Sequence, residues 1–223
     1  MVAMGGDASR GAILAPVPDH PLPPEWLANL QHLERAYLES GDPIRGSGFS
    51  GGPQRWRAER SPILEAIDTD GDIIDVGCAN GYLLECLVGW AHERGITLTP
   101  HGLDIGPGLV EAARARLPGA SIHLGNAWDW TPPRRYRYVY ALADLVPVDR
   151  LDLMVDRLLA EFVEPGGRLI VGDYGSRSRR ITPRSVAAIL RAHGLVVGEA
   201  AGGDPPVTRF AWLDAPTRPH PSH

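Results

Sequence analysis

From residue 70 onward, short apolar runs alternate with longer segments in which apolar side chains recur every three or four positions. The short runs are typical of buried strands, and the longer segments are typical of amphipathic helices. Strands that alternate with helices in this way form a parallel sheet covered on both faces. The first strands are predicted at residues 72–77, 99–105, 121–127, 137–142 and 168–174.

Two further apolar runs complete the pattern, at residues 195–200 and 208–214, and only a short link rich in glycine and proline, residues 202–206, joins them. Such a link requires a hairpin, which makes the last strand antiparallel to its partner. We therefore predict a doubly wound α/β fold with a seven-stranded sheet. The sheet is mostly parallel and has an antiparallel strand in the C-terminal hairpin.

The region before this sheet has a different composition. The first 24 residues contain five prolines and little periodic apolar content, which predicts a flexible arm over residues 1–24. Residues 25–68 are predicted to form a helical segment that covers the main domain, with one helix ending before Gly41 and a second over 53–67. The main domain is assigned to residues 69–215 and a flexible tail to 216–223.

Characteristic end residues mark the helices that cover the sheet. Pro107 is suited to the first turn of one helix, and an apolar stripe over 151–162 predicts another. For the last helix, Thr182 is the expected N-cap, Pro183 the first helical residue and Gly194 the terminator.

The composition narrows the functional classes. The 223 residues are 43% hydrophobic and 22% charged, as in an ordinary globular domain, and the net charge of -5 argues against nucleic acid as a partner. No apolar run is long enough to span a membrane, and Asp7 and Arg10 interrupt any secretory signal, so a cytoplasmic location is expected. Cysteines and histidines show no metal-ligand spacing, and no metal is predicted.

The strand at 72–77 ends in a glycine turn that leads directly into a helix. The turn has the sequence Asp75-Val76-Gly77-Cys78-Ala79-Asn80-Gly81. A glycine removes the side chain that would keep a ligand away from the backbone, and the free amides of the next helix point at that ligand. This arrangement predicts a cradle for an adenosine-containing cofactor. The alternative is that the glycines only let the helix pack closely on the sheet.

Two more features follow the next strands, at the sheet edge where open α/β folds bind ligands. Asp104 ends the second strand, where its carboxylate can accept hydrogen bonds from both ribose hydroxyls or else cap the following helix. Asn126 and Trp128 follow the third strand, where an amide can pair with an adenine edge and an indole can lie along the base. Each feature is common by itself, and their order and spacing carry the prediction.

In these motifs the chain resembles the class I S-adenosylmethionine-dependent methyltransferases, whose fold is Rossmann-like. The resemblance covers residues 72–174. It rests on the glycine turn, Gly102-Leu103-Asp104, Gly125-Asn126-Ala127 and Val163-Glu164-Pro165-Gly166-Gly167-Arg168-Leu169. It implies transfer of a methyl group from S-adenosyl-L-methionine to an O, N or C atom of a small-molecule acceptor by in-line displacement. The product of the cofactor would be S-adenosyl-L-homocysteine.

The resemblance also implies which residues hold the cofactor. The glycine turn with Asp75 would lie against the methionine moiety, Asp104 would hold the ribose and Asn126 the adenine. The methionine carboxylate needs a cation, for which Arg57 and Arg60 are candidates, although both could instead belong to a solvated helix face. The predicted cofactor site comprises Trp56, Arg60, Asp75, Gly77, Cys78, Ala79, Gly81, Tyr82, Asp104, Ile105, Asn126, Ala127, Trp128 and Ala141.

Three departures from the family pattern stand out. Ala79 occupies a position where glycine is common, and Asn126 one where aspartate is frequent. The Asp/Asn-Pro-Pro-aromatic sequence that marks the family's nucleic-acid amino methyltransferases is replaced by residues 141–144, Ala-Leu-Ala-Asp. The complete cofactor pattern and the acidic net charge favour a small-molecule acceptor.

A general base is needed only if the acceptor must lose a proton. Asp144, Asp173 and Tyr174 are the candidates, because they are predicted at the ends of the fourth and fifth strands, although such an acid could also be a helix cap or a surface group. The N-terminal helical segment, the loop at 46–52 and residues 174–180 are predicted to form a roof that excludes water.

Two other functions are compatible with parts of the pattern. A nicotinamide-dependent oxidoreductase would explain the glycine turn and Asp104, but the Gly-x-Gly-x-x-Gly spacing is missing and the closing hairpin argues against it. A non-catalytic protein could retain the cofactor pocket without an acceptor site. The sequence does not identify the acceptor or the oligomeric state, for which a homodimer is one option.

Overall fold

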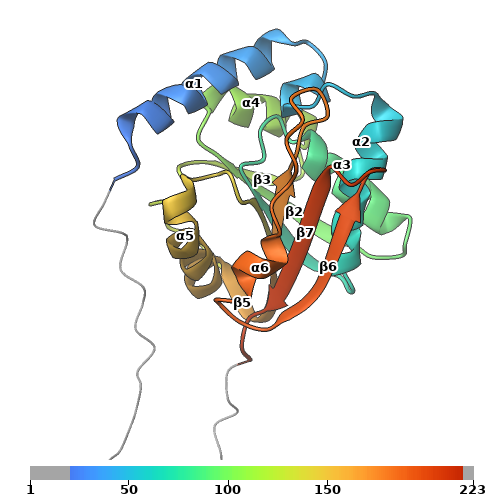
Figure 1. The fold of residues 1–223 in the computed structure, drawn as a ribbon, viewed down its shortest axis with the longest axis vertical. Helices are drawn as coiled ribbons and strands as arrows, with labels where there is room; N and C mark the ends of the chain where they lie inside the picture. The colour runs from blue at the N-terminus through green and yellow to red at the C-terminus, as the bar shows by residue number, and fades with distance from the viewer. Residues whose placement is uncertain (1–20, 218–223) are drawn as a thin grey trace, which may run out of the picture.

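Seven strands form one sheet in the order β3-β2-β1-β4-β5-β7-β6 (Figure 1). The structure is a computed structural model and describes residues 21–217. β7 is antiparallel to β5 and β6, and the other neighbouring pairs are parallel. The strands are β1 (Gly71–Val76), β2 (Leu98–Asp104), β3 (Ser121–Leu124), β4 (Tyr136–Leu142), β5 (Val163–Tyr174), β6 (Val196–Gly202) and β7 (Thr208–Asp214). The predicted sheet and its reversed strand are confirmed.

Six α-helices lie within the described residues, and shorter helical turns extend some of them. The helices are α1 (Pro24–Glu39), α2 (Pro53–Arg60), α3 (Tyr82–His92), α4 (Pro107–Arg116), α5 (Leu151–Arg157) and α6 (Val186–Leu190). The 3₁₀ turns are η1 (Arg45–Ser47), η2 (Ser61–Ala66) and η3 (Val148–Arg150), and η4 (Leu158–Phe162) is a π-helical turn. The predicted helix over 53–67 is thus divided into α2 and η2, because Pro62 cannot donate the hydrogen bond that would continue α2.

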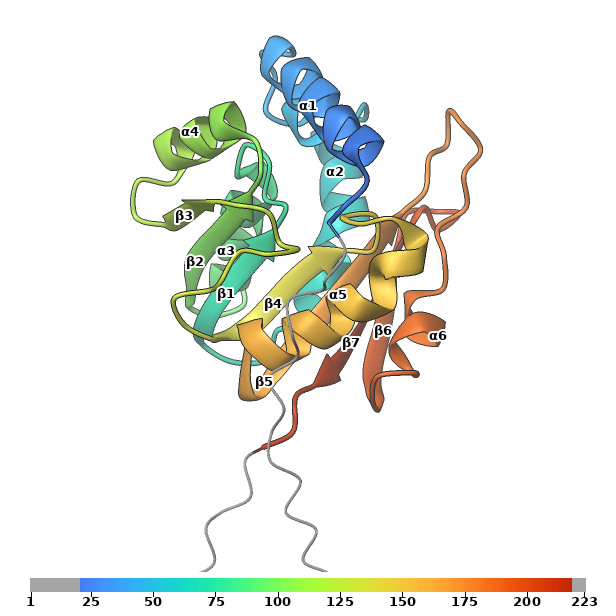
Figure 2. The ribbon, with the colours of Figure 1, turned by 90° about the vertical axis from the view of Figure 1, so that its left-hand side faces the viewer.

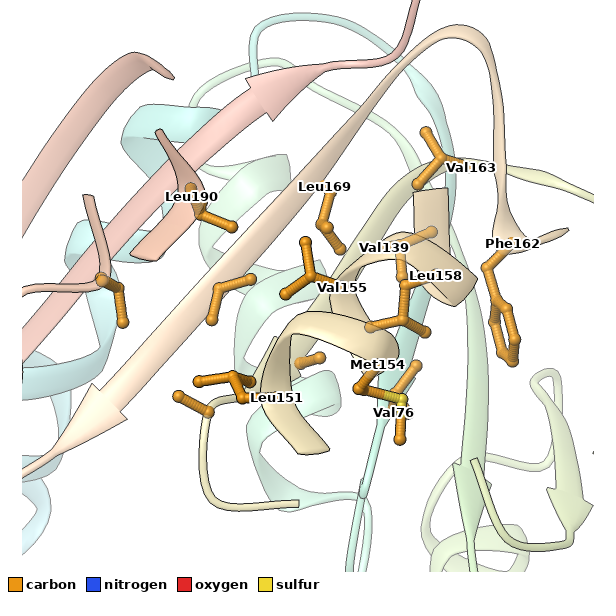
Figure 3. Packing of buried hydrophobic residues seen from close by; sticks show 14 of the residues in the cluster. Val76, Val139, Leu151, Met154, Val155, Leu158, Phe162, Val163, Leu169 and Leu190 are labelled. Carbon is orange, nitrogen blue, oxygen red and sulfur yellow. The ribbon is translucent and has the colours of Figure 1, made fainter. Parts of the chain in front are cut away.

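Each face of the sheet packs against its own hydrophobic cluster. Along β4, Val139 and Ala141 point to the cluster that contains α5 and α6, whereas Tyr138 and Tyr140 point to the cluster of α2, η2 and α3. Figure 3 shows the first cluster, in which Met154 and its neighbours on α5 meet the strands. Burial of these side chains on both faces explains why the strands are almost continuously apolar.

The last helix differs from its prediction. It begins at Val186 with Ser185 as the N-cap, instead of beginning after Thr182. The residues before it are held in another way, since both the backbone N–H and the guanidinium of Arg184 donate hydrogen bonds to the carboxylate of Asp173. This tertiary contact keeps residues 182–184 outside the helix.

The predicted arm and tail fall mostly outside the described residues. Within them, Leu22 is buried in the hydrophobic core and α1 begins at Pro24. Among residues 21–217, none of the helices combines the length and the apolar character that crossing a membrane would require.

His193 links the end of α6 to α5 by bonding to two aspartates. Its Nδ1 lies 2.7 Å from Asp156 and its Nε2 lies 3.1 Å from Asp152. Burial of the imidazole lowers its pKa, but the hydrogen bonds to Asp156 and Asp152 outweigh this effect and raise the pKa above its usual value.

We therefore expect His193→Gln to reduce the free energy of unfolding more at pH 5.5 than at pH 9. The raised pKa means that the contact stabilises the fold fully below the unfolded pKa of about 6.5, and that this stabilisation is lost as the pH rises through the folded pKa. Urea unfolding at the two pH values measures the difference. His92→Gln, on exposed α3 surface, is the control and should show no such dependence. Equal losses at both pH values would contradict the prediction.

Candidate functional site

The glycine turn after β1 has the backbone that the sequence predicts. Gly77, Ala79 and Gly81 all have positive φ, at 84°, 46° and 76°. The N–H groups of Gly77 and Cys78 donate to the carbonyl of Leu103, which fixes the turn against β2. Ala79 therefore adopts a left-handed conformation despite its methyl group, and this departure from the family pattern leaves the turn intact.

Asp104 organises the turn from the end of β2. One carboxylate oxygen accepts a hydrogen bond from the N–H of Ala79 and the other from the N–H of Gly106, both at 2.8 Å. Burial raises the pKa of Asp104, although the Gly106 and Ala79 amides counteract that rise. The N-cap residue of α4 is Gly106, which replaces Asp104 in the alternative role of helix cap, and Asp104 bonds to the N–H of that N-cap residue. Each oxygen has a second lone pair for a ribose hydroxyl.

Asp75 is buried in the middle of this region. Desolvation, reinforced by the negative charge of Asp104, raises the pKa of Asp75 to about 7. A carboxyl group with such a pKa is partly protonated at neutral pH, and a cationic ligand beside it would favour the ionised form. The site is therefore suited to a ligand that brings an ammonium group.

Replacing Asp75 by Asn is expected to stabilise the free protein at pH 8 by a few kcal/mol, since one pKa unit corresponds to about 1.4 kcal/mol. The raised pKa means that ionisation of Asp75 lowers stability progressively as the pH rises from about 4 to 7. The gain should therefore vanish at pH 4. Denaturant unfolding of both proteins across this range measures the effect, and a pH-independent difference would contradict the assigned pKa.

Arg60 is the last residue of α2, and its side chain is buried. Its guanidinium lies 3.6 Å from the centroid of the Tyr174 ring. The ring centroids of Phe49 and Trp56 are farther away, at 5.0 and 5.1 Å. Its Nε is buried and has no hydrogen-bond partner within residues 21–217. The nearest carboxylate oxygen, on Glu59, is 4.0 Å away. A buried guanidinium with an unused donor is suited to an anionic ligand group.

The structure separates the two arginines that the sequence offered as cations. Arg57 is exposed, bonds to Glu93 and stacks on Trp90 at 5.4 Å. Trp56 and Arg60, in contrast, are both buried, as their helical spacing predicts. Of the two arginines, Arg60 is the buried one.

Tyr140 and Tyr174 connect Arg60 to the sheet. Their hydroxyl oxygens are 2.5 Å apart, and they come from the adjacent strands β4 and β5. Burial raises the pKa of Tyr174, and the charges of Arg60 and Asp75 act on it with opposite signs. The cation, the two phenols and the buried acid therefore lie close together.

The N-terminal segment is fastened to the glycine turn through Asn80. The amide oxygen of Asn80 accepts hydrogen bonds from the Ser47 hydroxyl and the Tyr82 N–H, and its nitrogen donates to the carbonyl of Pro43. On α1, Glu34 accepts a hydrogen bond from the N–H of Gly108 at the start of α4. Figure 2 shows α1 and α2 beyond the ends of the strands, where a roof over the site was predicted.

The loop after β3 is held from the far side by α5. Asn126 accepts a hydrogen bond from the N–H of Trp128, and the buried guanidinium of Arg157 donates to the carbonyls of Ala127 and Trp130. Trp128 is 3% exposed and belongs to the hydrophobic core, which favours a packing role over contact with a base. Arg157 has no sequence signal beyond its place on α5, and the sequence analysis missed it.

The other predicted cofactor residues differ in how much of their side chain is exposed to solvent. Cys78 and Trp56 are buried, Tyr82 packs on Trp56 with centroids 5.2 Å apart, and Ala141 is paired between β1 and β5. Ile105 is exposed. Their contacts to a cofactor stay predictions.

Leu145, which the sequence analysis did not select, lies against Gly77. An added Cβ at position 77 would be 2.5 Å from the Cδ2 of Leu145. Together with the positive φ of 84°, this contact favours glycine at position 77.

The three candidate bases have very different surroundings. Asp173 is buried, and Arg184 holds both of its carboxylate oxygens. Tyr174 is engaged with Tyr140 and Arg60. Asp144 presents an exposed side chain, yet the protein around it desolvates the carboxylate and, with the charge of Asp173, raises its pKa. Asp144 is the candidate that remains free to accept a proton.

Comparison with known proteins finds partial sequence similarity to methyltransferases. No protein-family model matches the chain. Trans-aconitate 2-methyltransferase of Methylobacterium radiotolerans is 34% identical over 98 residues, which are 44% of this chain and 36% of that relative. The chain therefore spans well under two thirds of the length of this curated relative.

Solved structures with similar folds have low sequence identity. The N-methyltransferase NodS from Bradyrhizobium japonicum WM9, in complex with S-adenosyl-L-homocysteine, gives a TM-score of 0.58 at 14% identity and covers 84% of this chain and 98% of that one. The [4+2]-cyclase SpnF gives a TM-score of 0.64 at 13% identity. This match covers 88% of this chain and 98% of the SpnF chain. At such identities the likeness concerns the fold alone.

Proposed function

We propose, from the class I S-adenosylmethionine-dependent methyltransferase fold of this chain and from its methyltransferase relatives, that it methylates a small molecule. The methyl group would come from S-adenosyl-L-methionine and pass to an O, N or C atom of the acceptor. The observation that carries this proposal is the buried guanidinium of Arg60, with its unpartnered Nε, against Tyr174, a residue on which the charge of Asp75 also acts.

The residues fit the charge pattern of this cofactor. Arg60 would bind the methionine carboxylate and Asp75 would face the ammonium group, so each buried group would meet the opposite charge on the cofactor. Asp104 would accept hydrogen bonds from the ribose while it holds the turn. Asn126 would contact the adenine edge. The departures at Ala79 and Asn126 are compatible with these roles.

Bound S-adenosyl-L-methionine supplies a methyl group on a positively charged sulfur, so the leaving group needs no further activation. The protein must hold the acceptor in line and exclude water, and proximity of this kind is worth about 7–11 kcal/mol in favourable intramolecular cases. α1 and α2 are positioned to exclude water. Asp144 is the residue that could take a proton from the acceptor, whereas Asp173 and Tyr174 are occupied by Arg184, Tyr140 and Arg60.

The relative from Methylobacterium is named for trans-aconitate, but it matches less than half of this chain, so the acceptor is left open. SpnF is a cyclase with a similar fold, which illustrates that the fold does not determine the reaction. A cytoplasmic location and a homodimer stay predictions from the sequence.

The proposal is tested by ligand binding and by methyl transfer. Calorimetry should show binding of S-adenosyl-L-homocysteine, and the cofactor should raise the melting temperature where NAD does not. Incubation with methyl-labelled S-adenosyl-L-methionine and a metabolite extract should then yield a labelled small molecule. Stabilisation by NAD in preference to S-adenosyl-L-methionine would support an oxidoreductase instead. Binding without transfer to any acceptor would support a non-catalytic protein.

A further inference from the structure

A loop that is rich in arginine follows β5. Residues 175–184, called here the arginine hairpin, carry Arg177, Arg179, Arg180 and Arg184, and no acidic residue occurs between Asp173 and Glu199. The chain as a whole has a net charge of -5, so this positive charge is a local feature. Figures 1 and 2 show the hairpin, in orange, extending beyond the ends of the strands on the side where α1 and α2 lie. That is the edge of the predicted cofactor site.

The base of the arginine hairpin is firmly held. Ser176 and Ile181 form an antiparallel bridge, with N–H to carbonyl distances of 2.8 and 2.9 Å. Asp173 before the hairpin is joined to Arg184 at its end by three hydrogen bonds of 2.6 to 2.9 Å. Gly175 allows the close approach, since a Cβ there would lie 2.3 Å from the carbonyl oxygen of Ile181. Asp173 is thus a positioning residue for the hairpin.

The arginines differ in whether their charge is already paired. Arg184 is bound to Asp173, and Arg177 lies 3.7 Å from Glu59. Arg179 and Arg180, at the tip, are exposed and form no ion pair with any residue of the described chain. Arg180 also has a positive φ of 52°, a conformation that strains residues other than glycine and asparagine. Position 180 thus carries an arginine although glycine would fit this backbone conformation better.

Arg179 acts electrostatically on Tyr37 of α1. Burial raises the pKa of Tyr37 on α1, and the charges of Asp144 and Asp104 raise it further while that of Arg179 lowers it. Tyr37 therefore lies within electrostatic reach of the hairpin tip, the free carboxylate and the predicted ribose partner. This arrangement places the tip beside the space where an acceptor would approach the methyl group.

We propose that Arg179 and Arg180 bind an anionic group of the methyl acceptor, which makes the acceptor a small organic acid or phosphate ester. Guanidinium groups bind carboxylate and phosphate oxygens through paired hydrogen bonds. Two unpaired arginines on an acidic protein suit one such group, whereas nucleic acid requires a broad basic surface. The inference rests on the proposed methyltransferase function and specifies its substrate class.

Anion binding tests this proposal independently of methyl transfer. Citrate and inorganic phosphate are titrated by calorimetry into the protein with S-adenosyl-L-homocysteine at 0.15 M salt, to distinguish carboxylate from phosphate recognition. We expect one of them to bind, and the double variant Arg179→Ala/Arg180→Ala to weaken that binding at least 10-fold. Arg191→Ala, which removes an exposed arginine outside the hairpin, should leave it unchanged within 2-fold. Equal binding by the double variant, or no anion binding at all, would overturn the proposal.

Arg180→Gly separates the side chain from the backbone. Glycine relieves the positive φ, so the melting temperature should stay equal or rise while the anion affinity falls. Unchanged affinity would show that the side chain has no binding role and would overturn the proposal.

Methyl transfer provides the second readout. Labelled transfer should favour acids over their methyl esters, and the double variant should raise KM for acids with unchanged affinity for S-adenosyl-L-homocysteine. Transfer with equal KM for acids and esters would overturn this inference and leave the methyltransferase function intact. Failure of the wild-type protein to bind the cofactor would instead contradict the proposed function. Hairpin-dependent binding of an RNA oligonucleotide in preference to either small anion would overturn the small-molecule assignment.

Discussion

Replacing Arg60 by Ala is expected to weaken the binding of S-adenosyl-L-homocysteine about 100-fold, or roughly 2.7 kcal/mol. Loss of one partner of a buried, hydrogen-bonded charge pair costs about 2–5 kcal/mol in binding, and Arg60 is the buried cation of the site. Calorimetric titration measures the change. Arg57→Ala is the matched control from the same helix, because Arg57 is exposed and bonds to Glu93, and it should change affinity less than 2-fold.

A second ligand excludes a trivial structural explanation for this result. 5′-Methylthioadenosine has the adenosine and the sulfur but lacks the amino-acid carboxylate, so Arg60→Ala should leave its affinity nearly unchanged. Arg60→Lys should restore part of the affinity for S-adenosyl-L-homocysteine, since a cation returns without the planar guanidinium. If the Ala variant loses both ligands equally, Arg60 supports the fold of the site and does not bind the carboxylate.

Replacing Arg157 by Ala is expected to lower the free energy of unfolding by about 3–5 kcal/mol, the usual loss when one partner of a buried ion pair is removed. Arg157 is 2% exposed and donates hydrogen bonds to the carbonyls of Ala127 and Trp130 and to the carboxylate of Glu161. The substitution leaves all three acceptors without this donor. Urea unfolding measures the change, and exposed Arg191→Ala should stay within about 0.5 kcal/mol of wild type.

The same substitution should also affect the adenine side of the site, since the carbonyls that Arg157 holds belong to the loop that contains Asn126. Under conditions where the variant is folded, S-adenosyl-L-homocysteine and 5′-methylthioadenosine should therefore both bind more weakly. This outcome differs from that of Arg60→Ala, which spares the second ligand. A stability loss below about 1 kcal/mol would contradict the role assigned to Arg157.

The fold could be predicted from the chain because its signals are local. The alternation of strands and helices, the short link before β7 and the glycine turn each depend on residues close in sequence, and the predicted antiparallel strand of the C-terminal hairpin is observed. The positive φ of Gly77 and Gly81 likewise follows from residue type. Even the shared burial of Trp56 and Arg60 follows from their spacing on one helix.

The roles of individual polar residues depended on contacts between distant parts of the chain. Asp173 was a candidate base at the end of a strand, but Arg184 holds it and makes it the clamp of the arginine hairpin. That contact also displaced the start of the last helix to Val186. Trp128 was a candidate for base stacking, and the packing against α5 buries it.

The sequence by itself determined the seven-stranded architecture, the position of the glycine turn and the acid that supports it, because periodicity and backbone preference act over a few neighbouring residues. Only the tertiary structure decided that Arg60 is buried while Arg57 is exposed, that Asp144 has an exposed side chain whereas Asp173 is held by Arg184, and that two arginines of the hairpin form no ion pair within residues 21–217. Those properties depend on which elements meet across the sheet, and side-chain burial and pairing are set at that level.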